Sequence, residues 1–210
     1  MKIVVFGATG KTGIEVIKQS LDKGYEVVAY ARSPNKIEIQ NERLSFVKGE
    51  LNDAELIEST ISNADAVVSL LGASGNVKDN ALSQGVKNII SAMEKNGVSR
   101  VIQVLTSAAK DPNDKHDAYF DLMIGLVKIG IPRVYSEILE INDSLRNSGL
   151  NWTIVRAPFL TDKPLTKNLR IGYKGEKIVK KNLSRADLAW FMVDAVESEE
   201  YVRKAPFISN

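Results

Sequence analysis

Three glycines at a spacing of three residues stand near the start of the chain, in the stretch GATGKTG. Between a strand and a helix, Gly7 would permit a tight turn, Gly10 would let the backbone approach a pyrophosphate, and Gly13 would let the helix pack closely. The N–H groups and the dipole at a helix start hold negative charge. The loop also offers side-chain donors from Thr9, Lys11 and Thr12. The stretch therefore predicts a dinucleotide-binding loop.

Two other interpretations of these glycines are weaker. The phosphate loop of nucleotide hydrolases ends in Gly-Lys-Ser/Thr, as Gly10-Lys11-Thr12 does, but needs a glycine four spacer residues earlier. Val5 stands at that position, inside the apolar run IVVF. A glycine-rich turn without a ligand leaves the coincidence of the glycines, the donors and the helix start unexplained.

The end of the second apolar run indicates which dinucleotide is bound. Proteins that bind NAD commonly place Asp or Glu about 20 residues beyond the glycines, on the ribose 2′-hydroxyl. Here the run ends in Tyr30-Ala31-Arg32-Ser33. A guanidinium and a hydroxyl suit a 2′-phosphate, so Arg32 and Ser33 favour NADP(H) over NAD(H). The alternative is a surface arginine at the end of a strand.

Short apolar runs alternate with amphipathic stretches along the chain, and they predict the strands and helices that position these residues. Short apolar runs at 3–6, 26–30, 44–47, 66–70, 101–105 and 151–155 predict strands, and amphipathic stretches at 12–21, 54–61, 80–94, 119–129, 134–147 and 184–196 predict helices. Ser184 and Asp187 form a predicted capping box. Nearly continuous apolar strands in βαβ order predict an α/β fold: one Rossmann-like domain over 1–210, with a doubly wound parallel sheet and helices on both faces. We expect a substrate-side lid around 110–135 and 158–181, the latter stretch irregular.

Composition excludes several other classes of protein. The 210 residues carry a net charge of only +2, with scattered basic residues, so we expect no nucleic-acid partner. The chain has no cysteine and one histidine, His116, which we expect to be solvated, so no metal site is predicted. No apolar run approaches the roughly 20 residues of a membrane span, and no signal peptide is visible, so a cytoplasmic location is expected.

Several stretches together resemble the atypical short-chain dehydrogenase/reductase family. They are GATGKTG, YARSP after the second strand, VLTSAA, SGLNWTIVRAP and the tail KPLT…SRADLAWFMVDAV…EYVRKAPFIS. Within that family the tail is most similar to the NAD(P)H-binding, NmrA-like branch of biliverdin-IXβ reductase/flavin reductase. The resemblance covers nearly the whole chain and is weakest from Lys110 to Pro132.

The resemblance implies further cofactor contacts. It places Glu50 and Leu51 by the adenine, and Leu71 and Gly72 along the ribose and pyrophosphate. It also places Thr106, Ser107, Pro158 and Phe159 around the nicotinamide. Plain core packing is the alternative for the apolar members of this set.

The usual catalytic pair of the family is missing from this chain. The resemblance places a Lys at Ile138 and a Tyr at Val134, with Tyr135 one residue away. In this branch a His often stands at the position of Ile138, and a second His stands at the position of Phe159. Ser107 is then the first candidate for orienting a nicotinamide or a substrate carbonyl. The alternative is that its hydroxyl only forms a hydrogen bond to the nearby backbone. Tyr135 is a second candidate.

Some reactions do not need this pair. Hydride transfer to an oxidised flavin depends on stacking and orientation, and water can supply the proton. We therefore expect an NADPH-dependent reductase of flavins, quinones or similar small acceptors, in a monomer or small homo-oligomer. Apolar pocket walls could come from Phe120, Met123, Trp152 and Phe159, although plain core packing is the favoured alternative for Trp152 and for the Phe and Met of the helix at 119–129. The rival is a non-catalytic NADP(H)-binding redox sensor of NmrA-like type acting through a protein partner. A sugar-nucleotide epimerase is disfavoured by Ile138 and the short C-terminal region.

Overall fold

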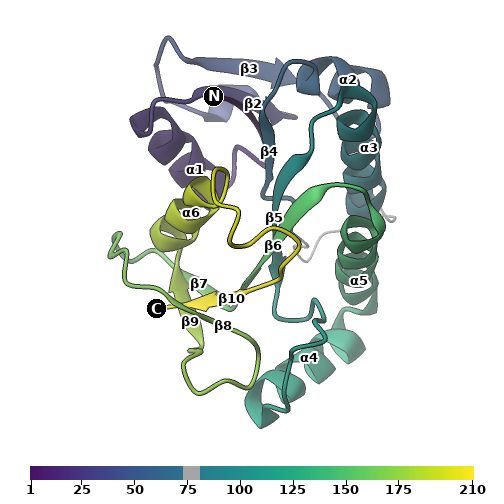
Figure 1. Ribbon diagram of the computed structural model, residues 1–210, viewed down its shortest axis with the longest axis vertical. Helices are drawn as coiled ribbons and strands as arrows, with labels where there is room; N and C mark the ends of the chain where they lie inside the picture. Colours follow the sequence, from purple (N-terminus) through teal and green to yellow (C-terminus); the bar gives the residue numbers. More distant parts are fainter. Residues whose placement is uncertain (73–80) are drawn as a thin grey trace.

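The computed structural model describes residues 1–72 and 81–210, which form a central eight-stranded sheet covered by helices on both faces (Figure 1). The strand order is β3-β2-β1-β4-β5-β6-β10-β8. The strands are β1 (Lys2–Phe6), β2 (Glu26–Ala31), β3 (Leu44–Lys48), β4 (Ala66–Ser69), β5 (Arg100–Thr106), β6 (Asn151–Ala157), β8 (Arg170–Gly172) and β10 (Phe207–Ser209). All pair in parallel except β8, which runs antiparallel to β10. The predicted Rossmann-like fold is confirmed, with β8 as an antiparallel edge.

Two helix layers explain why the strands are apolar on both faces. Helices α1 (Lys11–Asp22) and α6 (Arg185–Asp194) cover one face, and α2 (Ala54–Ile61), α3 (Ala81–Asn96) and α5 (Pro132–Asn147) cover the other (Figure 1). Alternate residues of β1 enter the two cores: Ile3 and Val5 pack beneath α1 and α6, whereas Val4 and Phe6 pack beneath the other layer. Burial on both faces is the reason for the continuous apolar runs.

Most predicted elements are present with small shifts at their ends. The bounds of α2 are as predicted, whereas α5 begins at Pro132 and α6 ends at Asp194. The predicted start of α3 at Asn80 lies outside the described residues. The stretch 158–181 is not wholly irregular, because it contains β8 and also β7 (Phe159–Thr161), which pairs with β9 (Asn182–Ser184) in a separate two-stranded sheet. Strands of three residues are too short to show an alternating pattern.

Helix α4 (Ala118–Gly130) lies at one end of the molecule and buries only Phe120 (Figure 1). The Phe120 ring packs edge to face against Phe207 with 5.0 Å between ring centroids. Trp152 is also buried, beneath the guanidinium of Arg146. Phe120 and Trp152 are therefore core residues, which is the role that the sequence favoured for both over a place in the pocket wall. Among the described residues, no helix is long and apolar enough to cross a membrane.

Candidate cofactor site

A cavity of about 350 Å³ lies at the carboxyl ends of β1, β4, β5 and β6. Its walls are formed by Gly7, Gly10, Lys11, Thr12, Gly13, Leu70, Gly72, Val104, Leu105, Thr106, Ala157, Pro158, Leu160, Arg185 and Leu188. Strands β1 and β4 are neighbours in the sheet, and the strand order reverses between them. Ligands of open α/β sheets bind at such a switch point, so the fold and the cavity indicate the same place.

The glycine loop presents an open helix end to this cavity. Gly7 has a φ of 75°, a left-handed conformation that favours glycine, and its carbonyl accepts a hydrogen bond from the Gly10 N–H at 3.1 Å. Helix α1 then begins at Lys11 with no side chain capping it. By contrast, Asp53 caps α2 and Ser184 caps α6. The first N–H groups of α1 therefore lack a side-chain acceptor and can bind an anion.

The start of a second helix lies at the same cavity. Arg185 and Leu188 of α6 line it, and neither was singled out from the sequence. The Ser184 half of the predicted capping box is present, since its side chain accepts a hydrogen bond from the Asp187 N–H at 3.0 Å, whereas the Ser184 N–H donates to Asn210 Oδ1 and not to Asp187. This cap located the helix start, but only the tertiary structure brings that start beside the glycine loop.

The structure divides the predicted cofactor residues into two groups. Eight line the cavity: Gly7, Gly10, Lys11, Thr12, Gly13, Gly72, Thr106 and Pro158. The others lie outside its walls: Thr9, Arg32, Ser33, Glu50, Leu51, Leu71, Ser107 and Phe159. Most of the second group follow β2, β3 or β4 at the same edge of the sheet, where an extended dinucleotide would pass beyond the cavity. Their roles remain predictions.

Arg32 follows β2 directly and is exposed. Within the described part of the chain, no hydrogen bond or ion pair engages its guanidinium. Ser33 is half-buried, and its carbonyl accepts the Lys36 N–H. Glu50 is exposed after β3, and its carbonyl accepts a hydrogen bond from the Tyr30 hydroxyl at 2.8 Å. This edge thus offers an available cation where the 2′-phosphate is predicted.

Phe159 points away from the cavity although its neighbours line it. Side chains alternate along β7, so Pro158 and Leu160 face the cavity, whereas Phe159 is 50% exposed. The expected wall at this position is therefore supplied by the residues on either side of the phenylalanine.

At the end of β5, Thr106 lines the cavity and its hydroxyl accepts the Ala108 N–H at 3.2 Å. The next residue, Ser107, is half-buried, and its hydroxyl makes no hydrogen bond to the described residues. The hydrogen bond to the nearby backbone, which was the alternative to a role in ligand binding, is therefore not formed with the described residues. The hydroxyl is available to a ligand.

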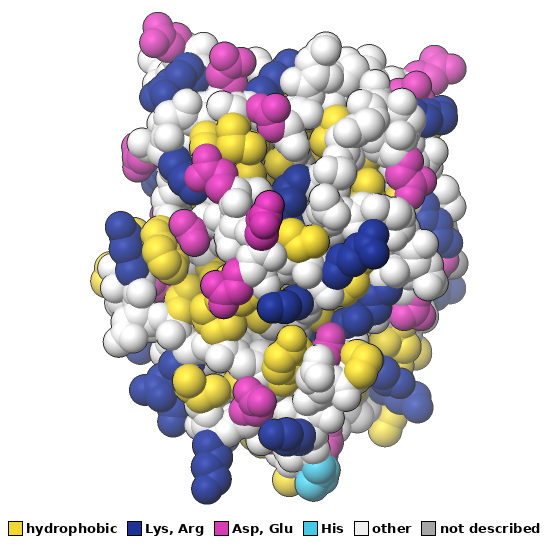
Figure 2. Space-filling view, in the orientation of Figure 1, with side chains coloured by type: hydrophobic (Ala, Val, Ile, Leu, Met, Phe, Trp, Pro, Cys, Tyr) yellow, Lys and Arg dark blue, Asp and Glu magenta, His cyan; other side chains and the backbone are white. Residues whose placement is uncertain are grey.

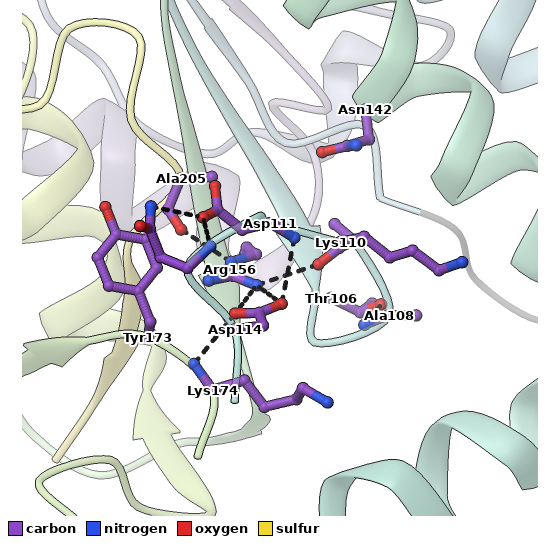
Figure 3. A network of polar contacts seen from close by, with 12 residues as sticks. Thr106, Ala108, Lys110, Asp111, Asp114, Asn142, Arg156, Tyr173, Lys174 and Ala205 are labelled. Carbon is purple, nitrogen blue, oxygen red and sulfur yellow. Dashed lines mark hydrogen bonds and ion pairs between the residues drawn. The ribbon is translucent and has the colours of Figure 1, made fainter. Parts of the chain in front are cut away.

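A buried ionic network fixes the loop that follows Ser107 (Figure 3). Arg156 of β6 is fully buried and donates through Nη1 to both oxygens of Asp114, at 2.8 and 2.7 Å, and through Nε to the Ala205 carbonyl. Asp114 also accepts the Lys174 N–H, and Arg146 pairs with Asp111 at 2.6 Å. The two stretches predicted as a lid therefore meet here and are tied to the sheet.

The positions of the family's catalytic pair are occupied by core residues. Val134 and Ile138 of α5 are buried among the apolar residues beneath that helix. Tyr135 is half-buried, and its hydroxyl makes no hydrogen bond to the described residues. Lys11 and Arg185 are the only ionisable side chains among the residues that line the described cavity. Its walls therefore contain no acid–base pair.

A doubly wound sheet with an uncapped, glycine-rich helix start at its switch point defines a dinucleotide-binding protein of the Rossmann type. The chain belongs to the NAD(P)H-binding family, whose model matches residues 7–199.

Known proteins agree with this assignment. A short-chain dehydrogenase/reductase from Veillonella parvula, solved in complex with NADP, superimposes with a TM-score of 0.80 at 19% identity, over 100% of this chain and 94% of that one. ChuY, an anaerobillin reductase from Escherichia coli O157:H7, gives 0.79 at 19% identity over 100% and 97%. The photosystem II assembly factor Ycf39 of Synechocystis is 24% identical over 216 residues, 97% of this chain. The chain spans only 61% of that relative. The NAD(P)H-binding family expected from the sequence is therefore confirmed by the family model, and the two solved structures share its fold.

Proposed function

We propose that the protein is an NADPH-dependent reductase that transfers hydride to a flavin, a quinone or a similar flat conjugated acceptor. The observation that carries this proposal is the cavity itself. Its walls combine the uncapped start of α1 and two cations, Lys11 and Arg185, with apolar residues that include Val104, Pro158 and Leu160. Diphosphate suits the helix start and the cations, and stacked aromatic rings suit the apolar residues.

Each part of the site has a proposed role. The N–H groups of the glycine loop bind the diphosphate, and Arg32 with Ser33 binds the 2′-phosphate. Thr106 and Ser107 orient the nicotinamide, which supplies the hydride when the cofactor is bound. Pro158 and Leu160 limit the space above the ring. Water supplies the proton, because the residues that line the described cavity include no Tyr, His or carboxylic acid side chain.

The test is acceptor-dependent oxidation of NADPH by the purified protein. FMN, riboflavin and a simple quinone are supplied in turn, with NADH in parallel. We expect turnover that requires an acceptor and prefers NADPH. Tight binding of NADPH without turnover on any acceptor would rule out the reductase.

The second candidate function is a redox sensor that binds NADP(H) and acts through a protein partner. The buried apolar residues Val134 and Ile138, at the positions of the catalytic pair, favour it. The relative named an assembly factor also fits a role other than catalysis. Capture of a partner that depends on NADPH against NADP⁺, together with absent turnover, would support the sensor.

A further inference from the structure

The two cations of the cavity wall share one carboxylate. Lys11, the first residue of α1, contacts Asp162 with 2.8 Å between Nζ and Oδ2. Arg185, the first residue of α6, contacts the same side chain with 2.6 Å between Nη1 and Oδ1. One aspartate therefore bridges the starts of two helices at the edge of the cavity.

The segment that carries Asp162 is held at both ends. Thr161 pairs with Ser184 in the β7–β9 sheet, so Asp162 emerges beside Arg185. Further along, the backbone N–H groups of Thr166 and Lys167 donate to the buried carboxylate of Asp187, at 3.0 and 2.6 Å. Residues 162–167 thus form a strap from β7 to α6. Because both ends of the strap are held, the fold keeps Asp162 beside the two cations.

This carboxylate is charged at neutral pH and easily displaced. Its hydrogen bond from Lys11 holds the pKa of Asp162 below its usual value. The Asp162 side chain is 60% exposed, and the side chains of Lys11 and Arg185 are 72% and 26% exposed, so water and salt screen the pair with Lys11 more strongly than the pair with Arg185. A second anion that contacts more donors can therefore replace Asp162. The diphosphate of a dinucleotide is such an anion, because the N–H groups of α1 also lie at this cavity.

We infer that Asp162 is an internal counter-ion that occupies Lys11 and Arg185 until the cofactor diphosphate displaces it, and that Arg185 is then a diphosphate ligand. This inference rests on the proposed cofactor binding and adds a control of its affinity. Competition from Asp162 weakens binding, and recapture of the two cations assists release. The arrangement suits a protein that must exchange oxidised for reduced cofactor.

The test compares NADPH dissociation constants, measured by fluorescence titration at low ionic strength, for the wild type and for Asp162→Asn. We expect about fivefold tighter binding in the variant, the size expected for the loss of exposed ion pairs. The matched control is Asp194→Asn. Asp194 is also exposed and lies at the other end of α6, and its one ion pair with the described residues is to Lys23, at 4.0 Å. We expect its affinity to be that of the wild type.

Arg185→Met provides the second part of the test. It should weaken NADPH binding, and adding Asp162→Asn should then tighten binding less than it does in the wild type, because the two residues act through one contact. Weaker NADPH binding by Asp162→Asn would overturn the inference, because the aspartate would then position the two cations for the cofactor. Unchanged binding would also overturn it, because the aspartate would then have no effect on affinity.

A second ligand separates this inference from the proposed function. Inorganic pyrophosphate reports only on the anion site, through its effect on the melting temperature. If the wild type fails to bind NADPH, the proposed function fails. A larger pyrophosphate effect in Asp162→Asn than in the wild type would still support the counter-ion, and equal effects would contradict it.

Discussion

The carbonyl oxygen of Gly7 lies 2.4 Å from the position that a Cβ on Gly13 would occupy. The carbonyl oxygen of Ala8 lies 2.7 Å from the same point. Both neighbours are backbone atoms, so they cannot rotate away as a side chain would. The close approach of α1 to the turn after β1 therefore requires glycine at position 13.

Gly13→Ala should lower the free energy of unfolding by about 2 kcal/mol, because overpacking displaces the loop or the helix. Gly10→Ala is the matched change three residues earlier. Its Cβ would meet only the Gly7 carbonyl, at 3.4 Å, and would stand in the cavity wall. We expect nearly unchanged stability and about tenfold weaker NADPH binding. Urea denaturation and fluorescence titration of both variants check this, and equal stability losses would contradict it.

Arg32→Ala should weaken NADPH binding by about ten- to a hundredfold, the cost of losing charged hydrogen bonds to the 2′-phosphate. NADH lacks that phosphate, so its affinity should change by less than about twofold. The control is Arg170→Ala, which removes the same charge from the exposed start of β8. Equal losses for the two cofactors would remove Arg32 from the 2′-phosphate site.

Ser107→Ala should reduce turnover by about tenfold while leaving the NADPH dissociation constant nearly unchanged. The reason is that its hydroxyl is proposed to orient the reacting groups and not to hold the cofactor. Ser136→Ala on α5, where the hydroxyl donates only to the Arg133 carbonyl, is the control. Unchanged steady-state turnover in Ser107→Ala would exclude the serine from the mechanism.

Asp114→Asn should destabilise the fold by about 3 kcal/mol, because the fully buried guanidinium of Arg156 loses its counter-charge. Glu58→Gln removes one partner of the exposed ion pair with Lys95 and should cost less than about 1 kcal/mol. Urea denaturation compares the two variants. A small effect of Asp114→Asn would show that the network in Figure 3 does not anchor the loop.

Stability should fall at alkaline pH through two tyrosines, the buried Tyr30 and the partly buried Tyr201. Burial, together with the charges of Asp53 and Glu50, raises the pKa of Tyr30 from 10.0 to about 12. Burial raises the pKa of Tyr201 in the same way. Because the folded-state pKa lies above the unfolded value, this stability is fully present below pH 10 and is lost as the pH rises toward 12.

Melting temperatures from about pH 8 to about pH 11 test this behaviour. Tyr30→Phe should flatten the alkaline decline without abolishing it, since Tyr201 remains. The variant should also lose about 1 kcal/mol at neutral pH with the hydrogen bond to the Glu50 carbonyl. An unchanged slope in Tyr30→Phe would show that its ionisation is not linked to unfolding.

The face of the molecule drawn in Figure 2 carries charges of both signs. Figure 2 shows Lys and Arg side chains interspersed with Asp and Glu over the visible face, without a basic stripe. Among the described residues, four of the nine exposed large hydrophobic side chains lie between Leu122 and Ile131, on α4 and at its end. Hydropathy predicted α4 as a helix but could not show how little of it is buried.

The amino-acid sequence determined the central fold and the glycine loop, because their signals are local. Apolar runs mark six of the seven described strands that pair in parallel in the central sheet, all except the three-residue β10, and Gly7, Gly10 and Gly13 mark the turn into α1. The Ser184 cap likewise depends on a residue only three positions away. Such patterns act through neighbours in the chain, so they can be recognised before the chain is folded.

Only the tertiary structure decided which residues share the cavity. Lys11 and Asp162 are 151 positions apart, and no local pattern relates them. The short β7–β9 pairing brings Asp162 beside Arg185, and the side-chain alternation on β7 turns Phe159 outward. Packing between distant elements also buries Phe120 and Trp152 in the core. Each outcome depends on packing between elements distant in sequence, which composition and periodicity do not encode.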